Sequence, residues 1–132
     1  MDEAERYKAG SALRRELLGE EHVARSERHR NAFNEDFHDL LTRHEWGEIW
    51  TRPGLPRQTR SCVTLGMLVA RGEWDEFRVH LRAAFASGLT REEIKEVLLQ
   101  AAVYCGVPAA HHGFRIAEEV FARAEVHLDE RR

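Results

Sequence analysis

Apolar side chains recur every three or four residues through most of this sequence, which is the period of an amphipathic α-helix. No long stretch alternates apolar and polar residues as a half-buried strand would. The chain has only three prolines and is rich in Ala, Leu, Glu and Arg, which favour helices. The pattern therefore predicts an all-α fold of about six helices joined by short loops.

The first half of the chain predicts two helices. One covers Glu5–Leu18, with three leucines on one face and Gly19 near its C-terminal end. The other covers Arg28–Arg43, because four apolar residues fit the i, i+4, i+7, i+8 spacing of a buried helical face. These four residues are Phe33, Phe37, Leu40 and Leu41.

The second half predicts four helices, the first of which is expected to be central to the fold. This helix spans residues 57–72, and its middle is apolar on nearly all sides. Residues 73–88 form the next helix, in which one face carries Trp74, Phe77, Leu81 and Phe85.

The last two helices have clear start signals. Thr90 followed by Glu93 is a capping box, and the helix that it begins is expected to stop at Gly106. Pro108 then suits the first turn of a final helix that reaches Ala124.

Composition narrows the class of protein. A length of 132 residues suits a single domain over residues 1–132, and the net charge of −3 gives no reason to expect nucleic acid or a membrane surface as a partner. No apolar run approaches the ~20 residues of a membrane span, and the N-terminal residues lack the apolar core of a secretory signal. A cytoplasmic protein is expected. Cys62 and Cys105 are expected to be buried thiols rather than a disulfide or a zinc site.

The sequence lacks the common motifs for dinucleotides, phosphates, serine hydrolases and metals. Its eight histidines form no cluster with metal-ligand spacing, and His111 and His112 would diverge by about 100° on a helix, so no metal site is expected. His80 lies near the boundary of a buried helical face, one turn after Glu76. A hydrogen bond between them would raise the basicity of the imidazole. The alternative is a surface pair with no catalytic task.

The segment WGEIWTRPGLPRQTRS, residues 46–61, combines two tryptophans with three arginines. The arginines, Arg52, Arg57 and Arg60, would suit a small anion with carboxylates. Glu48 could orient Arg52 or act as an acid or base. In the structural alternative, Trp46 and Trp50 fasten a short helix to the core and the charges form a solvated network of ion pairs.

This segment and LGMLVARGEWDEFRVHLRAAFASGLTREEIKEVLLQAAVYCGVPAA, residues 65–110, resemble the γ-carboxymuconolactone decarboxylases. The likeness extends from Phe33 to about Glu125, and WGE-x-WTRPGL, HLRAA and YCGVPAA occur in the family's order. It implies an orthogonal bundle of the alkylhydroperoxidase D-like type. Members of that superfamily with a redox site carry C-x-x-C-x3-H, and if His80 matches the histidine, Glu73 and Glu76 occupy the cysteine positions. Thiol peroxidase chemistry is therefore not expected.

Two positions depart from the family pattern. Relatives often have an amide-rich pair where this chain has Ala86 and Ser87, and Asn followed by a small residue or histidine where it has His111 and His112. Hydrogen bonds from side-chain amides at these positions are therefore not expected in this chain.

The resemblance implies decarboxylation of 4-carboxymuconolactone, a reaction of protocatechuate catabolism, with no cofactor, because the unsaturated lactone accepts the electron pair itself. It implies His80 and Glu48 as catalytic residues, with Glu76 assisting. Arg52 and Arg60 would bind carboxylate, and Arg57 is a weaker candidate.

Trp46 and Trp50 would supply apolar walls around that substrate. A homo-oligomer, trimer or hexamer, is also expected. The alternatives are a related enzyme acting on another small acid, and a non-catalytic oligomer that binds small acids.

Overall fold

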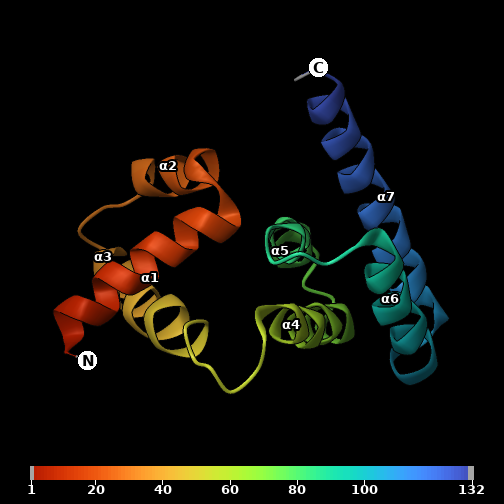
Figure 1. Cartoon of the computed structure of the whole chain (residues 1–132), viewed down its shortest axis with the longest axis horizontal. Coiled ribbons are helices and arrows are strands. Elements are labelled where there is room, and N and C mark those ends of the chain that lie inside the picture. The colour runs from red at the N-terminus through yellow and green to blue at the C-terminus, as the bar shows by residue number, and fades with distance from the viewer. Residues whose placement is uncertain (1, 131–132) are drawn as a thin grey trace. The chain divides into compact units, whose positions relative to one another are not determined.

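The computed structural model describes residues 2–130, with side chains up to residue 124. These residues form seven α-helices and one π-helix, and none of them lies in a strand, which confirms the all-α prediction (Figure 1). The chain divides into two compact units, with the boundary between Arg60 and Ser61. The elements are α1 (Glu3–Leu18), α2 (Glu20–Arg28), α3 (Glu35–Leu40), η1 (Leu41–Ile49), α4 (Arg57–Arg71), α5 (Trp74–Ala86), α6 (Arg91–Cys105) and α7 (Val107–Glu130).

Two glycines bring α1 and the π-helix η1 into backbone contact in the first unit. A Cβ atom added at Gly10 would lie 2.0 Å from the carbonyl oxygen of Thr42. One added at Gly47 would lie 2.2 Å from the carbonyl oxygen of Arg6. Both distances are far inside van der Waals contact, so only glycine allows the two helices to cross this closely.

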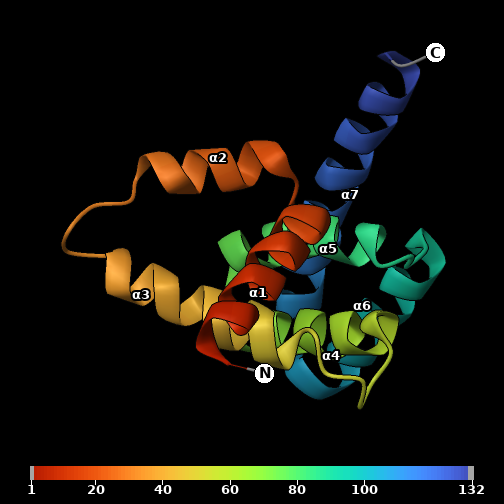
Figure 2. The same cartoon turned by 60° about the vertical axis from the view of Figure 1, so that its left-hand side comes forward.

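The prediction of one helix over Arg28–Arg43 is wrong. The structure has α2 ending at Arg28, a non-helical connection, and then α3 (Figure 2). The side chain of Asn31 accepts hydrogen bonds from the backbone N–H groups of Phe33 and Asn34. These bonds compete with helix formation. Phe33 is consequently 98% exposed rather than buried.

The π-helix η1 continues directly from α3 and carries part of the WGEIW motif. Its wider turn is visible at its end, where the N–H of Trp50 donates to the carbonyl of Glu45, an i→i+5 bond of 3.0 Å. The sequence analysis predicts a helix only as far as Arg43 and gives a short helix at Trp46 and Trp50 only as an alternative, and it contains no sign of the π geometry.

The second unit has the main hydrophobic core. Leu65 and Val69 of α4, Phe77 and Leu81 of α5, and Leu98 of α6 are almost fully buried in it. α7 closes this core with Ile116, Ala117 and Val120.

The start signals of α6 and α7 are confirmed. The N–H of Glu93 donates to the Thr90 hydroxyl at 3.1 Å, and the Thr90 N–H donates to the Glu93 carboxylate at 2.9 Å. Gly106, with φ +100°, separates the two helices, and Pro108 lies in the first turn of α7.

Several burial predictions fail at the edges of this core. Phe77 and Leu81 are buried, but Trp74 and Phe85 are only partly so. Cys62 is partly buried and Cys105 is exposed, so the prediction of two buried thiols is wrong, although both are free. No helix among the described residues is long and apolar enough to cross a membrane.

Candidate functional site

The residues predicted for the site fall into both units. The first unit contains Trp46, Glu48, Trp50, Arg52 and Arg60, and the second contains Glu76 and His80.

Trp46 and Trp50 form a stacked pair in and just after η1. Their ring centroids are 5.5 Å apart and their planes differ by 20°. Both side chains are buried. Stacked, buried rings at this spacing hold the last turn of η1 in one conformation.

Glu48 is bound by a histidine that the sequence analysis did not select. Nδ1 of His44, one turn earlier in η1, lies 2.9 Å from Oε2 of Glu48, where its N–H donates to the carboxylate. This hydrogen bond is the main cause that lowers the pKa of Glu48 below its ordinary value, followed by the positive charge of Arg6. Arg52 makes a smaller contribution in the same direction. Glu48 is therefore a carboxylate at neutral pH and is unsuited to be a general acid there.

The positive charge near Glu48 comes partly from α1. Glu3 connects the two helices, because its carboxylate contacts Nη1 of Arg6 at 2.7 Å and Nε of Arg43 at 3.1 Å. The field at Glu48 thus depends on how α1 packs against η1.

The three arginines after η1 differ in their surroundings. Arg52 is exposed in the connection that follows η1, and its backbone N–H donates to the carbonyl of Ile49. Arg57 forms an ion pair with Glu16 at 3.2 Å. Arg60 is half-buried at the first turns of α4.

His80 of α5 is buried, with 8% of its side chain exposed, whereas Glu76 is exposed. Nε2 of His80 lies 4.0 Å from Oε2 of Glu76. This separation is longer than a hydrogen bond, so the bond expected between them is not formed in this structure. An imidazole in such a position is shielded from bulk water and can hold or deliver a proton to a bound molecule.

His112 has a structural contact in the second unit. Its ring stacks on Trp74 with centroids 4.2 Å apart, and Trp74 meets Phe77 edge-on at 5.8 Å. The next residue, Gly113, is buried, and a Cβ there would lie 2.7 Å from Cδ2 of Leu98. Within the described part of the chain, no group of three or more His, Cys, Asp and Glu side chains could hold a metal ion.

Residues 35–119 match the carboxymuconolactone decarboxylase family. The chain belongs to this family. It is 50% identical over 121 residues to the 4-carboxymuconolactone decarboxylase of Acinetobacter baylyi, covering 92% of this chain and 90% of that protein. A protein of the same name from Pseudomonas putida is 46% identical over 48 residues, which are 36% of this chain and 100% of that sequence. The nitrosuccinic acid decarboxylase npaB of Metarhizium robertsii is 40% identical over 103 residues, 78% of this chain and 72% of that protein.

The sequence analysis of this family member did not select His44 and Arg6, the two residues that most strongly affect Glu48. The His44–Glu48 spacing of four residues is the same signal that drew attention to Glu76 and His80, so His44 could have been found. Arg6 gave no such signal, because it acts on Glu48 from another helix.

Proposed function

We propose that this protein decarboxylates 4-carboxymuconolactone to 3-oxoadipate enol-lactone and CO2, as part of protocatechuate catabolism. The observation that carries the proposal is the 50% identity to a decarboxylase of that name over about nine tenths of both chains. The protein is thus a carboxy-lyase that acts on a small dicarboxylate.

The reaction requires no electron acceptor besides the substrate. The bond between the ring carbon and its carboxylate breaks, and CO2 leaves without the electron pair. The ring double bond passes that pair to the lactone carbonyl, which becomes a furan-like oxyanion. A proton added to the ring carbon beside the carbonyl then gives the enol-lactone. The protein must hold the dianion, stabilise the oxyanion and deliver one proton.

His80 is the proposed source of the proton or of the hydrogen bond to the oxyanion, because it is the buried, titratable side chain among the candidates. Glu76, exposed on the same helix, would exchange protons between His80 and solvent. Glu48 is ionised and held by His44, so its proposed role is to orient a positive group or accept a proton rather than to donate one.

Arg52 and Arg60 are the proposed ligands of the carboxymethyl arm. A cation against the departing carboxylate would stabilise the substrate more than neutral CO2, so the arginines favour catalysis only if they bind the other carboxylate. Trp46 and Trp50 are proposed to keep that leaving group in an apolar environment, and their mutual stacking fixes their orientation.

A spectrophotometric assay with freshly prepared 4-carboxymuconolactone tests the proposal. His80→Ala should lower kcat/KM by about 10²–10⁴, the usual contribution of general acid or oxyanion catalysis. His29→Ala, at an exposed histidine, is the matched control and should leave kcat/KM unchanged. Wild-type protein that is folded but turns over no substrate would refute the assignment. Normal activity of His80→Ala would refute only the role of His80.

Arg52→Ala separates binding from chemistry. It should raise KM more than it lowers kcat, because the carboxymethyl arm is bound equally in the ground and transition states. Arg25→Ala, at an exposed arginine that pairs with Glu21, is the control.

The 40% identity to a nitrosuccinic acid decarboxylase supports nitrosuccinate as a second candidate substrate. Nitrosuccinate is also a small dicarboxylate whose own substituent can accept the electron pair after loss of CO2. If kcat/KM is higher for nitrosuccinate than for 4-carboxymuconolactone, nitrosuccinate is the preferred substrate of this protein.

A homo-oligomer, trimer or hexamer, in the cytoplasm completes the proposal. Large apolar side chains are exposed in both units, among them Phe33, Val103 and Tyr104. Such exposure is typical of surfaces that bind another protein chain. The two free thiols agree with a reducing compartment.

A further inference from the structure

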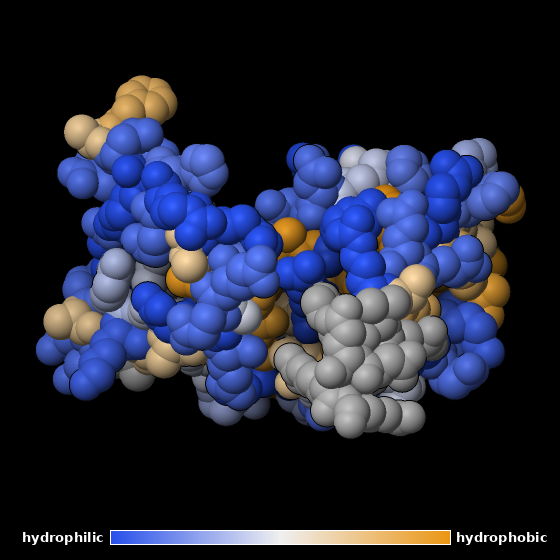
Figure 3. Space-filling model, turned by 90° about the horizontal axis from the view of Figure 1, so that it is seen from above, coloured by the Kyte–Doolittle hydropathy of each residue, from blue (hydrophilic) through white to orange (hydrophobic). Residues whose placement is uncertain are grey.

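The second unit contains a buried hydroxyl group that the mechanism above leaves unused. Hydrophilic residues dominate the face of the molecule seen in Figure 3, where water can satisfy their polar groups. Ser61, near the start of α4, is in contrast only 2% exposed. Its Oγ atom has no hydrogen-bond partner among the described residues. A buried hydroxyl without a partner costs free energy, so a bound molecule that supplies the partner would explain its presence.

The buried hydroxyl of Thr42 in η1 shows how a helix normally satisfies such a group. It donates to the carbonyl of His38, four residues earlier, at 2.9 Å. Ser61 could reach the carbonyl of Arg57 in the same way, but it makes no such bond. Its hydroxyl is therefore available to donate to another molecule.

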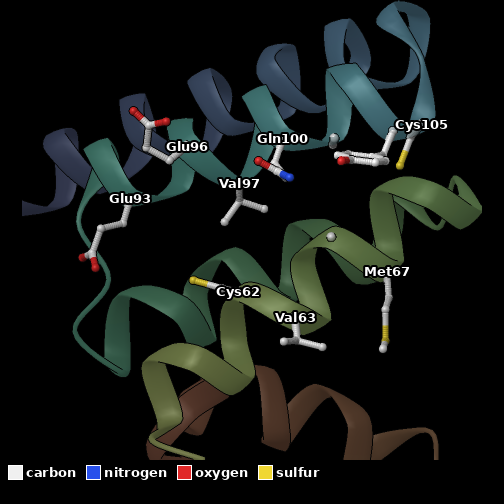
Figure 4. A pocket seen from close by; sticks show the side chains of 11 residues that line it. Cys62, Val63, Met67, Glu93, Glu96, Val97, Gln100 and Cys105 are labelled. Carbon is white, nitrogen blue, oxygen red and sulfur yellow. The ribbon is translucent and has the colours of Figure 1, made fainter.

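Ser61 lies on the buried face of α4, whereas other residues of this helix line an open groove. The groove lies between α4 and α6 and has a volume of about 650 Å³ (Figure 4). Leu65 and Val69, four and eight residues after Ser61 and thus near it around the helix, are fully buried in the core. Ser61 is not among the residues that line the groove. From α4, the groove is lined by Cys62, Val63, Gly66 and Met67.

The groove does not suit the proposed substrate. Its charged lining residues are Glu93 and Glu96, and none of the described residues that line it is an arginine or a lysine. The two carboxylates would repel a dianionic lactone. His80, like Ser61, lies outside the groove.

Ser61 and His80 belong to helices that share one core. α5 places His80 beside Phe77 and Leu81, which pack in the same hydrophobic cluster as Leu65 of α4. Among the described residues of the second unit, Ser61 and His80 are the two buried polar side chains. The interior of this unit thus offers a bound molecule one hydroxyl and one imidazole.

The proposed reaction needs hydrogen donors at two different atoms. The proton is added to the ring carbon beside the carbonyl, whereas the negative charge develops on the carbonyl oxygen. An imidazole N–H that is directed at the carbon is not available to the oxygen. A neutral hydroxyl binds the oxyanion more strongly than the uncharged carbonyl, so it stabilises the transition state more than the substrate. Apolar neighbours strengthen such a hydrogen bond.

We propose that Ser61 is the oxyanion donor. Its hydroxyl donates a hydrogen bond to the lactone carbonyl oxygen as charge develops there, and His80 delivers the proton to the ring carbon. No covalent bond forms between Ser61 and the substrate. This inference rests on the proposed function and assigns to two residues the two roles that were left open for His80.

Ser61→Ala distinguishes this role from a structural one, because turnover and stability should change in opposite directions. In the lactone assay, kcat should fall about 10²–10³-fold, the usual loss for one oxyanion donor, with KM nearly unchanged. The urea midpoint of unfolding should rise, because the variant no longer buries a hydroxyl without a partner. A hydroxyl with a structural role would instead lower the midpoint when it is removed.

Two further variants serve as controls. Ser61→Cys preserves the shape of the side chain but replaces the hydroxyl with a weaker donor, so kcat should remain low. Ser87→Ala is the matched control. Oγ of Ser87 also has no partner among the described residues, but this side chain is only partly buried and lies just after the last residue of α5. Its removal should leave kcat unchanged.

The outcomes separate this inference from the proposed function. Wild-type kcat in either Ser61 variant would overturn the role of Ser61 and leave the decarboxylation intact. A Ser61→Ala protein with a lowered urea midpoint, or an equal loss of kcat in Ser87→Ala, would overturn it as well. A folded wild type that turns over no lactone would overturn both the role of Ser61 and the proposed function.

Discussion

The crossing of α1 and η1 at Gly10 makes a strong prediction about stability. Replacing Gly10 with alanine places a methyl group 2.0 Å from the carbonyl oxygen of Thr42 and 2.7 Å from the backbone nitrogen of Gly47. Both neighbours are backbone atoms, which cannot rotate away as a side chain can. The helices must therefore separate, and the packing between them is lost.

The expected magnitude combines two opposing effects. Alanine favours a helix over glycine by about 1 kcal/mol, whereas overpacking costs about 1–3 kcal/mol and more when backbone must move. The clash is severe here, so Gly10→Ala should lower the free energy of unfolding by about 1–3 kcal/mol net. For a chain of this size that corresponds to a fall in Tm of roughly 3–10 °C.

Two other helical glycines provide graded controls. At Gly113 the one close contact of the added Cβ would be the end of the Leu98 side chain at 2.7 Å, which can move, so Gly113→Ala should cost less. At Gly66 it would meet nothing within 4 Å, so Gly66→Ala should be neutral or stabilising by up to about 1 kcal/mol.

Urea unfolding followed by circular dichroism, on protein dilute enough to be monomeric, would rank the three variants. The reasoning is refuted if Gly10→Ala is as stable as Gly66→Ala. Activity adds a second measure, because η1 carries Glu48 and Gly10→Ala should impair turnover even where the protein remains folded.

Three further predictions concern single side chains. His44→Gln should raise the pKa of Glu48 toward its ordinary value of 4.5, which carboxyl NMR can measure. In the wild type, the stability that Glu48 contributes is present above pH 4.5 and is lost as the pH falls through the lowered pKa of Glu48. An unchanged titration midpoint of Glu48 in His44→Gln would mean that His44 does not bind Glu48 in solution. Thr90→Ala should cost about 1 kcal/mol in urea unfolding, because it removes the cap of α6. A thiol reagent at pH 8 should modify Cys105 before Cys62, because burial raises the pKa of Cys62; equal rates would contradict this.

The helices of the second unit could be predicted because local signals and core packing agree there. Thr90 and Glu93 mark the start of α6, and Pro108 marks that of α7. The buried faces of these helices repeat over several turns, so the period is unambiguous.

The first unit shows where such reasoning fails. The spacing of Phe33, Phe37 and Leu40 fits a buried helical face, but spacing alone does not distinguish a face covered within the chain from one left exposed. Asn31 and Asn34 were a usable signal, since their side chains bind backbone groups in non-helical turns. The π geometry of η1 depends on packing and has no signature in a 3.6-residue period.

The candidate site was only partly predictable for a similar reason. Sequence spacing within one helix can bring His44 to Glu48, because it depends on local geometry alone. The influence of Arg6 depends on how α1 packs against η1, which no local pattern records.

The glycine crossing also bears on how the chain can be re-engineered. α1 lies outside residues 35–119, the part of the chain matched to the family. Its main chain nevertheless fixes how closely η1, the helix that carries Glu48, can pack. A chimera in which only Glu3–Leu18 came from a relative would place against η1 a helix whose surface need not match it. Productive recombination should therefore exchange the two helices as a single cassette, with both glycines retained.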